Sequence, residues 1–386
     1  MKLLHTSDWH VGKTIRGFSR ADEHRAVLAE IAAVAEREEV DLIVIAGDLF
    51  DSAAPPPEAE EIVYRTLLAF AGTGAEVAVI AGNHDNARRL GAVAPVFEFS
   101  RVHLVTEPTR PDEGGVLQLR ARDGSDMRVA MLPFVSKRGI VRAEHLMEHE
   151  AFENAQAYSQ RLALVVAALC QKFDAGTVNI LAAHAFVLGA VSGGGERAAH
   201  LVDEYAVTSQ AFPASIGYAA LGHLHRPQRI PGATALHYCG SPLQLDFGET
   251  EQAKQVNVVR MEPGVPADVT IVRLTAGQSL RSVVGTMDEL GALAASVDDD
   301  TWLRVIVRGS AHAGLATRVR ELFGERAVDI RVDSPTTSPG RTNVDHRQRS
   351  PQELFAEYMA RTNVVDDRVA ALFADLLDAD HEVAAP

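Results

Sequence analysis

Five times along the chain, an aliphatic stretch ends in a short turn that carries histidine, aspartate or asparagine. Segments 41–46 and 76–81 are two such stretches, and their continuous apolar residues are typical of strands buried on both faces of a parallel sheet. Helical apolar patterns over 22–39 and 58–71 alternate with them, which predicts an α/β fold. Ligand sites in open α/β sheets lie beyond the carboxyl ends of the strands. We therefore expect the five turns to meet in one crevice.

The turns supply ligand types that suit transition metals. The candidate ligands are Asp8, His10, Asp48, Asn83, His184, His223 and His225. Carboxylate and amide oxygens mixed with imidazole nitrogens suit divalent manganese, iron or zinc, and are too rich in nitrogen for calcium or magnesium sites. Seven ligands exceed what one ion needs, so we predict two metal ions about 3.5–4 Å apart. Such a pair clamps a phosphate and activates water for in-line attack.

Each turn taken alone also has a structural interpretation. Asp8 and His10 could be a surface coincidence, and His223-Leu224-His225 could be an alternating strand with two polar faces. The turn at 82–85 could be a simple β-turn, because Asn, Asp and Gly favour turns. Five such coincidences in chain order favour the functional interpretation.

Composition narrows the class of protein. With 386 residues, 47% hydrophobic and 23% charged, the chain predicts two or three domains with a substantial core rather than a disordered chain. Cys170 and Cys239 are the only cysteines, which excludes a disulfide framework and a cysteine-based zinc site. The polar N-terminal residues and the lack of a long apolar run predict a cytoplasmic protein. With a formal net charge of −15, a nucleic-acid partner would require a local basic rim.

The ordered turns resemble the motifs of the calcineurin-like metallophosphoesterase superfamily, which read D-x-H, GD, GNH-[DE], H and GH-x-H. The resemblance implies a layered β-sandwich flanked by helices. It implies two ligand sets that share a bridging Asp48: Asp8, His10, Asp48 and His225 for one ion, and Asp48, Asn83, His184 and His223 for the other. It also implies that His84 contacts the scissile phosphate and assists the leaving group. Asp85 either orients His84 or caps the turn.

Stretches around the motifs are similar to the SbcD family of bacterial nuclease subunits. These stretches are 6–14, 16–20, 23–24, 47–51 with 55–56, 222–228, 238–243, 247–249 with Lys254, and 350–355. The similarity implies a manganese-dependent 3′-to-5′ exonuclease and an endonuclease that opens DNA ends and hairpins. It implies a role in DNA repair and recombination with the coiled-coil ATPase SbcC. Since the chain contains no G-x-x-x-x-G-K-[ST] phosphate-binding loop, any ATP dependence would come from that partner.

Three regions are predicted: a metallophosphoesterase domain at 1–270, a small α+β capping domain at 271–338, and a linker with a helical arm at 339–386. By the resemblance, the cap contacts DNA and restricts access. The apolar pattern over 351–377 fits either a helical arm that docks on the base of the SbcC coiled coil or a segment that folds back on its own domain. The resemblance also implies a homodimer, formed through helical segments 58–71 and 87–99.

Basic residues just after the first turn are candidate DNA-binding residues. Lys13, Arg16 and Arg20 could grip phosphates next to the cleaved bond, and the alternative is a solvated basic turn. Two other functions also stay open. A phosphodiesterase for cyclic nucleotides or other small phosphoesters would turn over small substrates without the cap or the arm. An inactive scaffold would usually lack a ligand, whereas every motif position is filled here.

Overall fold

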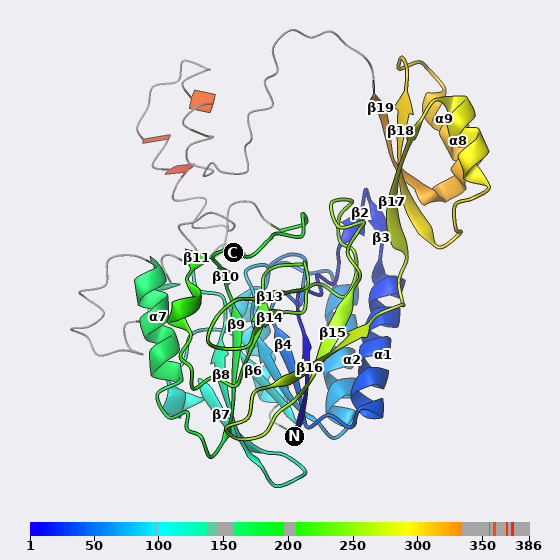
Figure 1. Ribbon diagram of the computed structural model, residues 1–386. Coiled ribbons are helices and arrows are strands. Elements are labelled where there is room, and N and C mark those ends of the chain that lie inside the picture. Colours follow the sequence, from blue (N-terminus) through cyan, green and yellow to red (C-terminus); the bar gives the residue numbers. More distant parts are fainter. Residues whose placement is uncertain are drawn as a thin grey trace.

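The computed structural model describes residues 1–97, 99–136, 139–140, 143, 158–196, 206–333, 355, 358–359, 368–369 and 372–373. Within these residues, two six-stranded sheets stack face to face with helices outside them. Figure 1 shows helices α1 and α2 on one side of this sandwich and α7 on the other. This arrangement is the layered β-sandwich flanked by helices that the motifs imply.

The first sheet carries three of the five turns. Its strand order is β16 (Asp268–Arg273), β15 (Gln255–Arg260), β1 (Lys2–Thr6), β4 (Leu42–Ala46), β5 (Glu76–Ile80) and β6 (Val102–Val105). Strands β1, β4, β5 and β6 are parallel, whereas β15 runs antiparallel to β1. Helices α1 (Ala21–Arg37) and α2 (Pro57–Gly72) bury aliphatic residues such as Ile31 and Leu67 against its outer face.

The second sheet carries the other two turns. Its order is β13 (Gln228–Ile230), β14 (Leu236–Tyr238), β12 (Tyr218–Gly222), β9 (Val178–His184), β8 (Asp126–Leu132) and β7 (Val116–Arg120). Helix α7 (Tyr158–Leu169) covers its outer face, close to β10 (Phe186–Val187) and β11 (Ala206–Val207). Side chains that alternate along the strands, such as Val44 and Ile180, fill the space between the two sheets. Every residue of β4 and β9 is therefore buried, as their apolar patterns predict.

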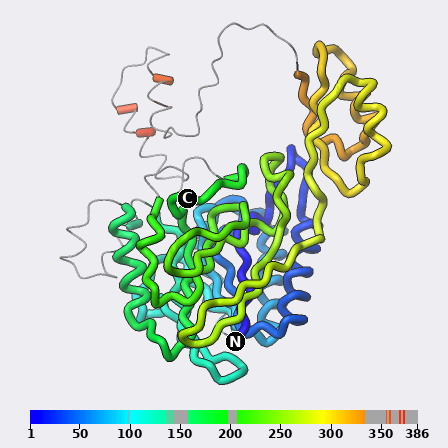
Figure 2. Tube along the Cα trace, in the orientation of Figure 1, coloured from blue at the N-terminus to red at the C-terminus, as the bar shows by residue number. Residues whose placement is uncertain are grey.

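A smaller α+β unit follows β16, and it stands out from the sandwich in Figure 2. It consists of parallel strands β17 (Ser279–Gly285), β18 (Thr301–Arg308) and β19 (Ala327–Asp333) with helices α8 (Met287–Ala294) and α9 (Leu315–Phe323). The sequence pattern predicts α8, β18, α9 and β19 but not β17, and α8 begins with a capping box between Thr286 and Glu289. The predicted arm over 351–377 lies outside the described residues, apart from isolated positions such as Phe355 and Phe373, whose rings stack at 3.8 Å.

Several elements differ from the sequence pattern. The helix expected over 87–99 is divided into α3 (Ala87–Ala92) and α4 (Ala94–Phe97). Strands β6, β7, β13 and β14 were not predicted because each is short or partly exposed and lacks a continuous aliphatic run. The remaining short elements are β2 (Thr14–Ile15), β3 (Phe18–Ser19), η1 (Pro111–Glu113), η5 (Ser209–Ala211) and η6 (Gly324–Arg326). In the part of the chain that the structure describes, no helix has the length and apolar character needed to cross a membrane.

Candidate metal centre

The seven candidate ligands gather at one edge of the sandwich. Asp8 and His10 follow β1, Asp48 follows β4 and Asn83 follows β5, all from the first sheet. His184 ends β9, and His223 and His225 follow β12, both from the second sheet. All seven residues are buried. The sequence predicts a crevice beyond the strands of one open sheet. The site lies instead at an edge that two sheets share, because the parallel strands of both sheets point their carboxyl ends in the same direction.

Backbone strain is concentrated in these turns. Asp8, His10, Asp48 and His223 have φ angles of 53°, 49°, 52° and 102°, in the left-handed region that residues with a Cβ rarely adopt. Each such residue costs on the order of 1–3 kcal/mol, and such strain clusters at functional sites. Gly222 allows the sheets to approach, since a Cβ there would overlap the carbonyl oxygen of Ala46. The turns are therefore held in shapes that aim their polar side chains at one another.

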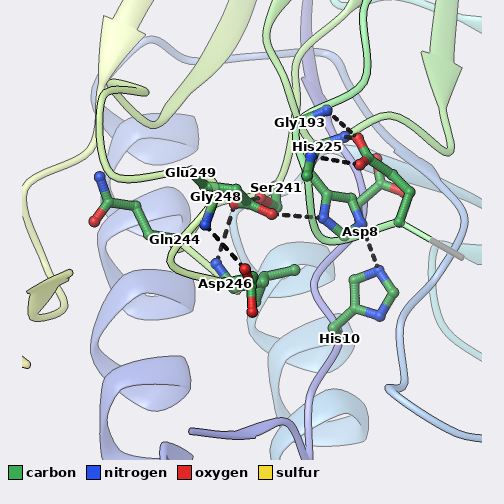
Figure 3. Close-up of polar contacts among 12 residues, drawn as sticks. Asp8, His10, Gly193, His225, Ser241, Gln244, Asp246, Gly248 and Glu249 are labelled. Carbon is green, nitrogen blue, oxygen red and sulfur yellow. Dashed lines mark hydrogen bonds and ion pairs between the residues drawn. The ribbon is translucent and has the colours of Figure 1, made fainter. Parts of the chain in front are cut away.

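One group of ligands contains Asp8, His10 and His225, whose ligand atoms lie within 4.8 Å of one another. The Nε2 atoms of His10 and His225 face each other at 3.0 Å, as Figure 3 shows. The main-chain N–H of His223 donates to Asp8 Oδ1 at 2.9 Å, and the Ser7 hydroxyl donates to Oδ2 at 2.6 Å. These contacts orient the Asp8 carboxylate toward the two imidazole rings.

A second group adjoins the first. Asn83 Oδ1 lies 2.9 Å from His184 Nε2 and 2.8 Å from His223 Nδ1. The His184 Nδ1–H donates to the Ala46 carbonyl at 2.8 Å, which leaves Nε2 as the ligand atom. Asp48 Oδ2 lies 3.5 Å from both His10 Nε2 and His184 Nε2. Asp48 therefore lies between the two groups, where a bridging carboxylate is expected.

The donor set fits a divalent cation. Burial raises the pKa of Asp8 to about 6 and lowers the pKa of His10 to about 4. His10 is therefore neutral at physiological pH, the form in which imidazole binds metal, and a cation would favour the charged form of the Asp8 carboxylate.

His84 lies beside these groups, and its ring centroid is 4.5 Å from that of His10. Its main-chain N–H donates to Asp48 Oδ1, and its Nδ1–H donates to the Asp51 carbonyl, both at 2.8 Å. His84 also forms a compact group of potential ligands with His10 and Asp48. It is thus close enough to act on a group held by the ligands.

Asp85 does not orient His84, so the structure corrects this prediction. Its carboxylate accepts main-chain N–H donors from Leu49, Phe50 and Gly82 at 3.2, 3.0 and 2.9 Å. Burial raises the pKa of Asp85, and these donors oppose the rise. Asp85 therefore caps the turn, which is the second role that the sequence allows. Its hydrogen bonds link the turn after β5 to the turn after β4.

Comparison with known proteins identifies the chain. Residues 1–227 match the calcineurin-like phosphoesterase family, and residues 276–363 match the type 5 capsule protein repressor C-terminal domain. The SbcD subunit of the SbcCD nuclease from Bacillus subtilis is 31% identical, with 97% of each chain covered. The SbcD subunits from Rhodobacter capsulatus and Escherichia coli K12 are 32% and 30% identical, covering 92% and 76% of this chain and 94% and 73% of theirs. The chain belongs to the SbcD family of calcineurin-like phosphoesterases. It is a metallophosphoesterase that hydrolyses phosphodiesters, with a divalent metal site.

Three acidic residues of this SbcD-type centre were not singled out from the sequence as site residues. Asp51 Oδ1 lies 3.5 Å from His10 Nδ1, Glu196 Oε1 accepts the main-chain N–H of His225 at 2.9 Å, and Glu249 Oε1 lies 2.8 Å from His225 Nδ1. Although burial acts in the opposite direction, the charge of Lys254 lowers the pKa of Glu249 to about 2. The run Gly193-Gly194-Gly195 before Glu196 was an available signal. Asp51 and Glu249 lie in stretches similar to the SbcD family, but no local pattern relates Glu249 to His225.

The three candidate DNA-binding residues differ in the SbcD-type structure. Lys13 is partly exposed and pairs with Asp51 at 3.1 Å. Arg16 is half-exposed and pairs at 3.0 Å with Asp329 of β19, which joins the β2–β3 hairpin to the smaller unit. The Arg20 side chain is 0% exposed, so the prediction that Arg20 contacts DNA is wrong. Its guanidinium instead binds both oxygens of Glu23 and the Gln244 carbonyl.

Replacing Arg20 by methionine will lower the free energy of unfolding by about 1–3 kcal/mol, because it leaves the partly buried Glu23 carboxylate without its main partner. Urea-induced unfolding measures this loss. Arg25→Met is the matched control. Arg25 lies on α1, which Arg20 precedes as the N-cap residue, and because Arg25 is exposed its pairs with Asp22 and Glu58 are expected to contribute little. Weaker DNA binding by a fully stable Arg20→Met variant would contradict the structural role.

Proposed function

We propose that this SbcD-type chain is a DNA nuclease that cleaves phosphodiester bonds at DNA ends and hairpins. The observation that carries the proposal is the pair of adjoining ligand groups on either side of Asp48, with His84 beside them. The 31% identity to an SbcD subunit of the SbcCD nuclease over nearly the whole chain supports DNA as the substrate.

Two divalent ions, manganese by preference, are the proposed cofactors. The proposed ligand sets are Asp8, His10, Asp48 and His225 for one ion, and Asp48, Asn83, His184 and His223 for the other. When bound, such ions hold the phosphate and activate water for in-line attack. The outward hydrogen bonds of His184 and His225 support this assignment, since each keeps Nδ1 occupied and Nε2 directed at the centre.

His84 is the proposed proton donor to the leaving oxygen. Its Nδ1–H is held by the Asp51 carbonyl, so Nε2 is the atom that exchanges a proton with substrate. A charged His84 would also stabilise negative charge that develops on the phosphoryl group. Among the predicted DNA-binding residues, Lys13 stays a candidate for a flanking phosphate, whereas Arg16 is better suited to holding the cap.

The proposed assembly places this chain with an SbcC-type ATPase. The relatives are by name subunits of SbcCD, and we propose contact through the helical arm in 339–386. We further propose a catalytic domain at 1–270 and a DNA-contacting cap at 271–338. The C-terminal family match over 276–363 crosses the boundary between the proposed cap and the proposed arm and covers the first part of the arm.

Homodimer formation through the helices after the second and third turns is also proposed. Exposed apolar side chains support it: Leu68 of α2 is 53% exposed, Val96 of α4 is 70% exposed and the following Phe99 is 96% exposed. Exposed apolar side chains that gather into one contiguous patch are typical of interaction surfaces. Sedimentation velocity gives the oligomeric state directly.

The isolated chain with manganese will cleave linear duplex and hairpin-ended DNA, and DNA cleavage by the purified chain tests the proposal. Bis-p-nitrophenyl phosphate is assayed in parallel. Rapid hydrolysis of the small ester with intact DNA, both alone and with an SbcC-type ATPase and ATP, would contradict the nuclease and favour a small-molecule phosphodiesterase. No turnover of either substrate in any arm would favour a scaffold.

A further inference from the structure

A buried carboxylate that belongs to none of the five turns supports His225 from behind. The Glu249 side chain is 0% exposed, and its Oε1 accepts the His225 Nδ1–H at 2.8 Å. Figure 3 shows Glu249 on the side of His225 opposite to His10. One imidazole nitrogen thus faces the carboxylate, and the other faces the metal centre.

The ammonium group of Lys254 pairs with the Glu249 carboxylate. Lys254 Nζ lies 2.7 Å from Glu249 Oε2 and also donates to Ser241 Oγ at 2.8 Å and to the His225 carbonyl at 3.2 Å. The main-chain N–H of Leu245 donates to the same Oε2 at 3.1 Å. Since an unpaired buried charge is costly, this set of donors keeps Glu249 ionised and in one position.

A glycine-rich segment, residues 193–195, is here called the strap, and it lies against the contact between Glu249 and His225. A Cβ on Gly195 would lie 2.5 Å from Glu249 Oε1 and 2.8 Å from His225 Nδ1, so only glycine fits there. Glu196, directly after the strap, accepts the His225 main-chain N–H at 2.9 Å. Both the ring and the main chain of His225 are therefore held by carboxylates, and the main chain of Gly195 lies close against the Glu249 contact.

We infer that Glu249 is a positioning residue for metal binding by His225, which it holds with the proton on Nδ1 and the lone pair on Nε2. The inference rests on the proposed two-metal site. A carboxylate behind a ligand histidine fixes its tautomer and ring orientation, and its loss typically lowers metal affinity by about 10–100-fold. Lys254 acts through Glu249, because it balances the charge that the contact requires.

The substitution Glu249→Gln keeps the side-chain size but replaces one acceptor oxygen by an amide donor, which must then face either His225 or Lys254. The Glu249→Gln variant leaves the Lys254 charge without its anion. We therefore also test the double variant Glu249→Gln/Lys254→Met, which contains no unpaired buried charge at this site. Asp246→Asn is the matched control. Asp246 lies in the same loop, and its carboxylate accepts the local N–H of Gly248 at 2.9 Å, whereas its contact with Glu249 is made by the main-chain carbonyl, which the substitution keeps.

Manganese titration of the full chain tests the inference, with free Mn²⁺ followed by electron paramagnetic resonance. Wild type and Asp246→Asn are each expected to bind two ions, and the affinity for each ion should be the same in the two proteins. Glu249→Gln and the double variant are both expected to lose about 10–100-fold in affinity for one ion and to keep the other. Their cleavage rates should recover at saturating manganese, because His225 itself remains.

Thermal unfolding of the metal-free variants separates positioning from folding. The double variant is expected to be more stable than Glu249→Gln while showing the same loss of metal affinity. Wild-type affinity for both ions in either variant would overturn the inference and leave the proposed nuclease intact. A wild-type chain that binds fewer than two ions would overturn the two-metal proposal, and the inference with it.

Discussion

Replacing His84 by alanine will lower the rate of DNA cleavage by about 10²–10⁴-fold while both metal ions remain bound. The main-chain N–H that His84 donates to Asp48 is retained in alanine, so the position of the proposed bridging ligand does not depend on the side chain. What is lost is the imidazole held by the Asp51 carbonyl. Single-turnover cleavage at saturating DNA and manganese measures the chemical step, and manganese titration counts the ions.

His103→Ala is a matched control for this experiment. His103 is a half-buried histidine on β6 that pairs with Glu76 at 2.8 Å, and neither residue belongs to the ligand groups. Its variant is expected to cleave DNA at the wild-type rate. Loss of both ions in His84→Ala would show that His84 is itself a ligand and would contradict the proton-donor role.

Replacing Asp48 by asparagine will lower cleavage at least about 10³-fold, the factor that corresponds to about 4 kcal/mol of transition-state stabilisation. Asp48 Oδ2 lies 3.5 Å from a histidine of each ligand group, and the substitution places an uncharged amide there. Both ions should therefore bind more weakly, whereas a change in any other ligand should affect mainly one. Manganese titration and cleavage rates measured at increasing manganese check the two parts of this prediction.

Asp41→Asn is the control at the opposite end of the same strand. Asp41 precedes β4 and accepts the main-chain N–H groups of Lys2 and Arg122, at 2.8 and 3.0 Å. The same change of charge at this position is expected to leave metal binding and cleavage unaltered. Wild-type affinity for one ion in Asp48→Asn would show that Asp48 serves a single site and does not bridge.

Much of the fold and the whole candidate ligand set could be predicted because their signals are local. A continuous apolar run such as that of β4 specifies a buried strand, and the turn that follows it carries Asp48 next to a glycine. The parallel direction of β1, β4 and β5 then brings their turns to one edge. Short edge strands such as β13 lack this signal, since hydrogen bonding to a neighbour rather than their own pattern specifies them.

The roles of charged residues outside the turns depended on tertiary structure. Arg20 has the same local features as a DNA-binding arginine, yet it is buried and donates to the carbonyl of Gln244, which lies 224 positions away in the chain. Two roles were open for Asp85, and the structure shows the capping one, with main-chain donors that the turn after β4 supplies. Side-chain direction and burial at these positions are set by packing between distant segments, which no local spacing encodes.

The amino-acid sequence by itself determined which strands end in polar turns and therefore which seven residues can serve as ligands. Tertiary structure alone decided that the ligands come from two sheets, that Asp48 lies between the two groups, and that Glu249 supports His225. The physical reason is that a turn's residue types and backbone strain are properties of a few neighbouring residues. A hydrogen bond between buried groups instead depends on the folded path of the whole chain.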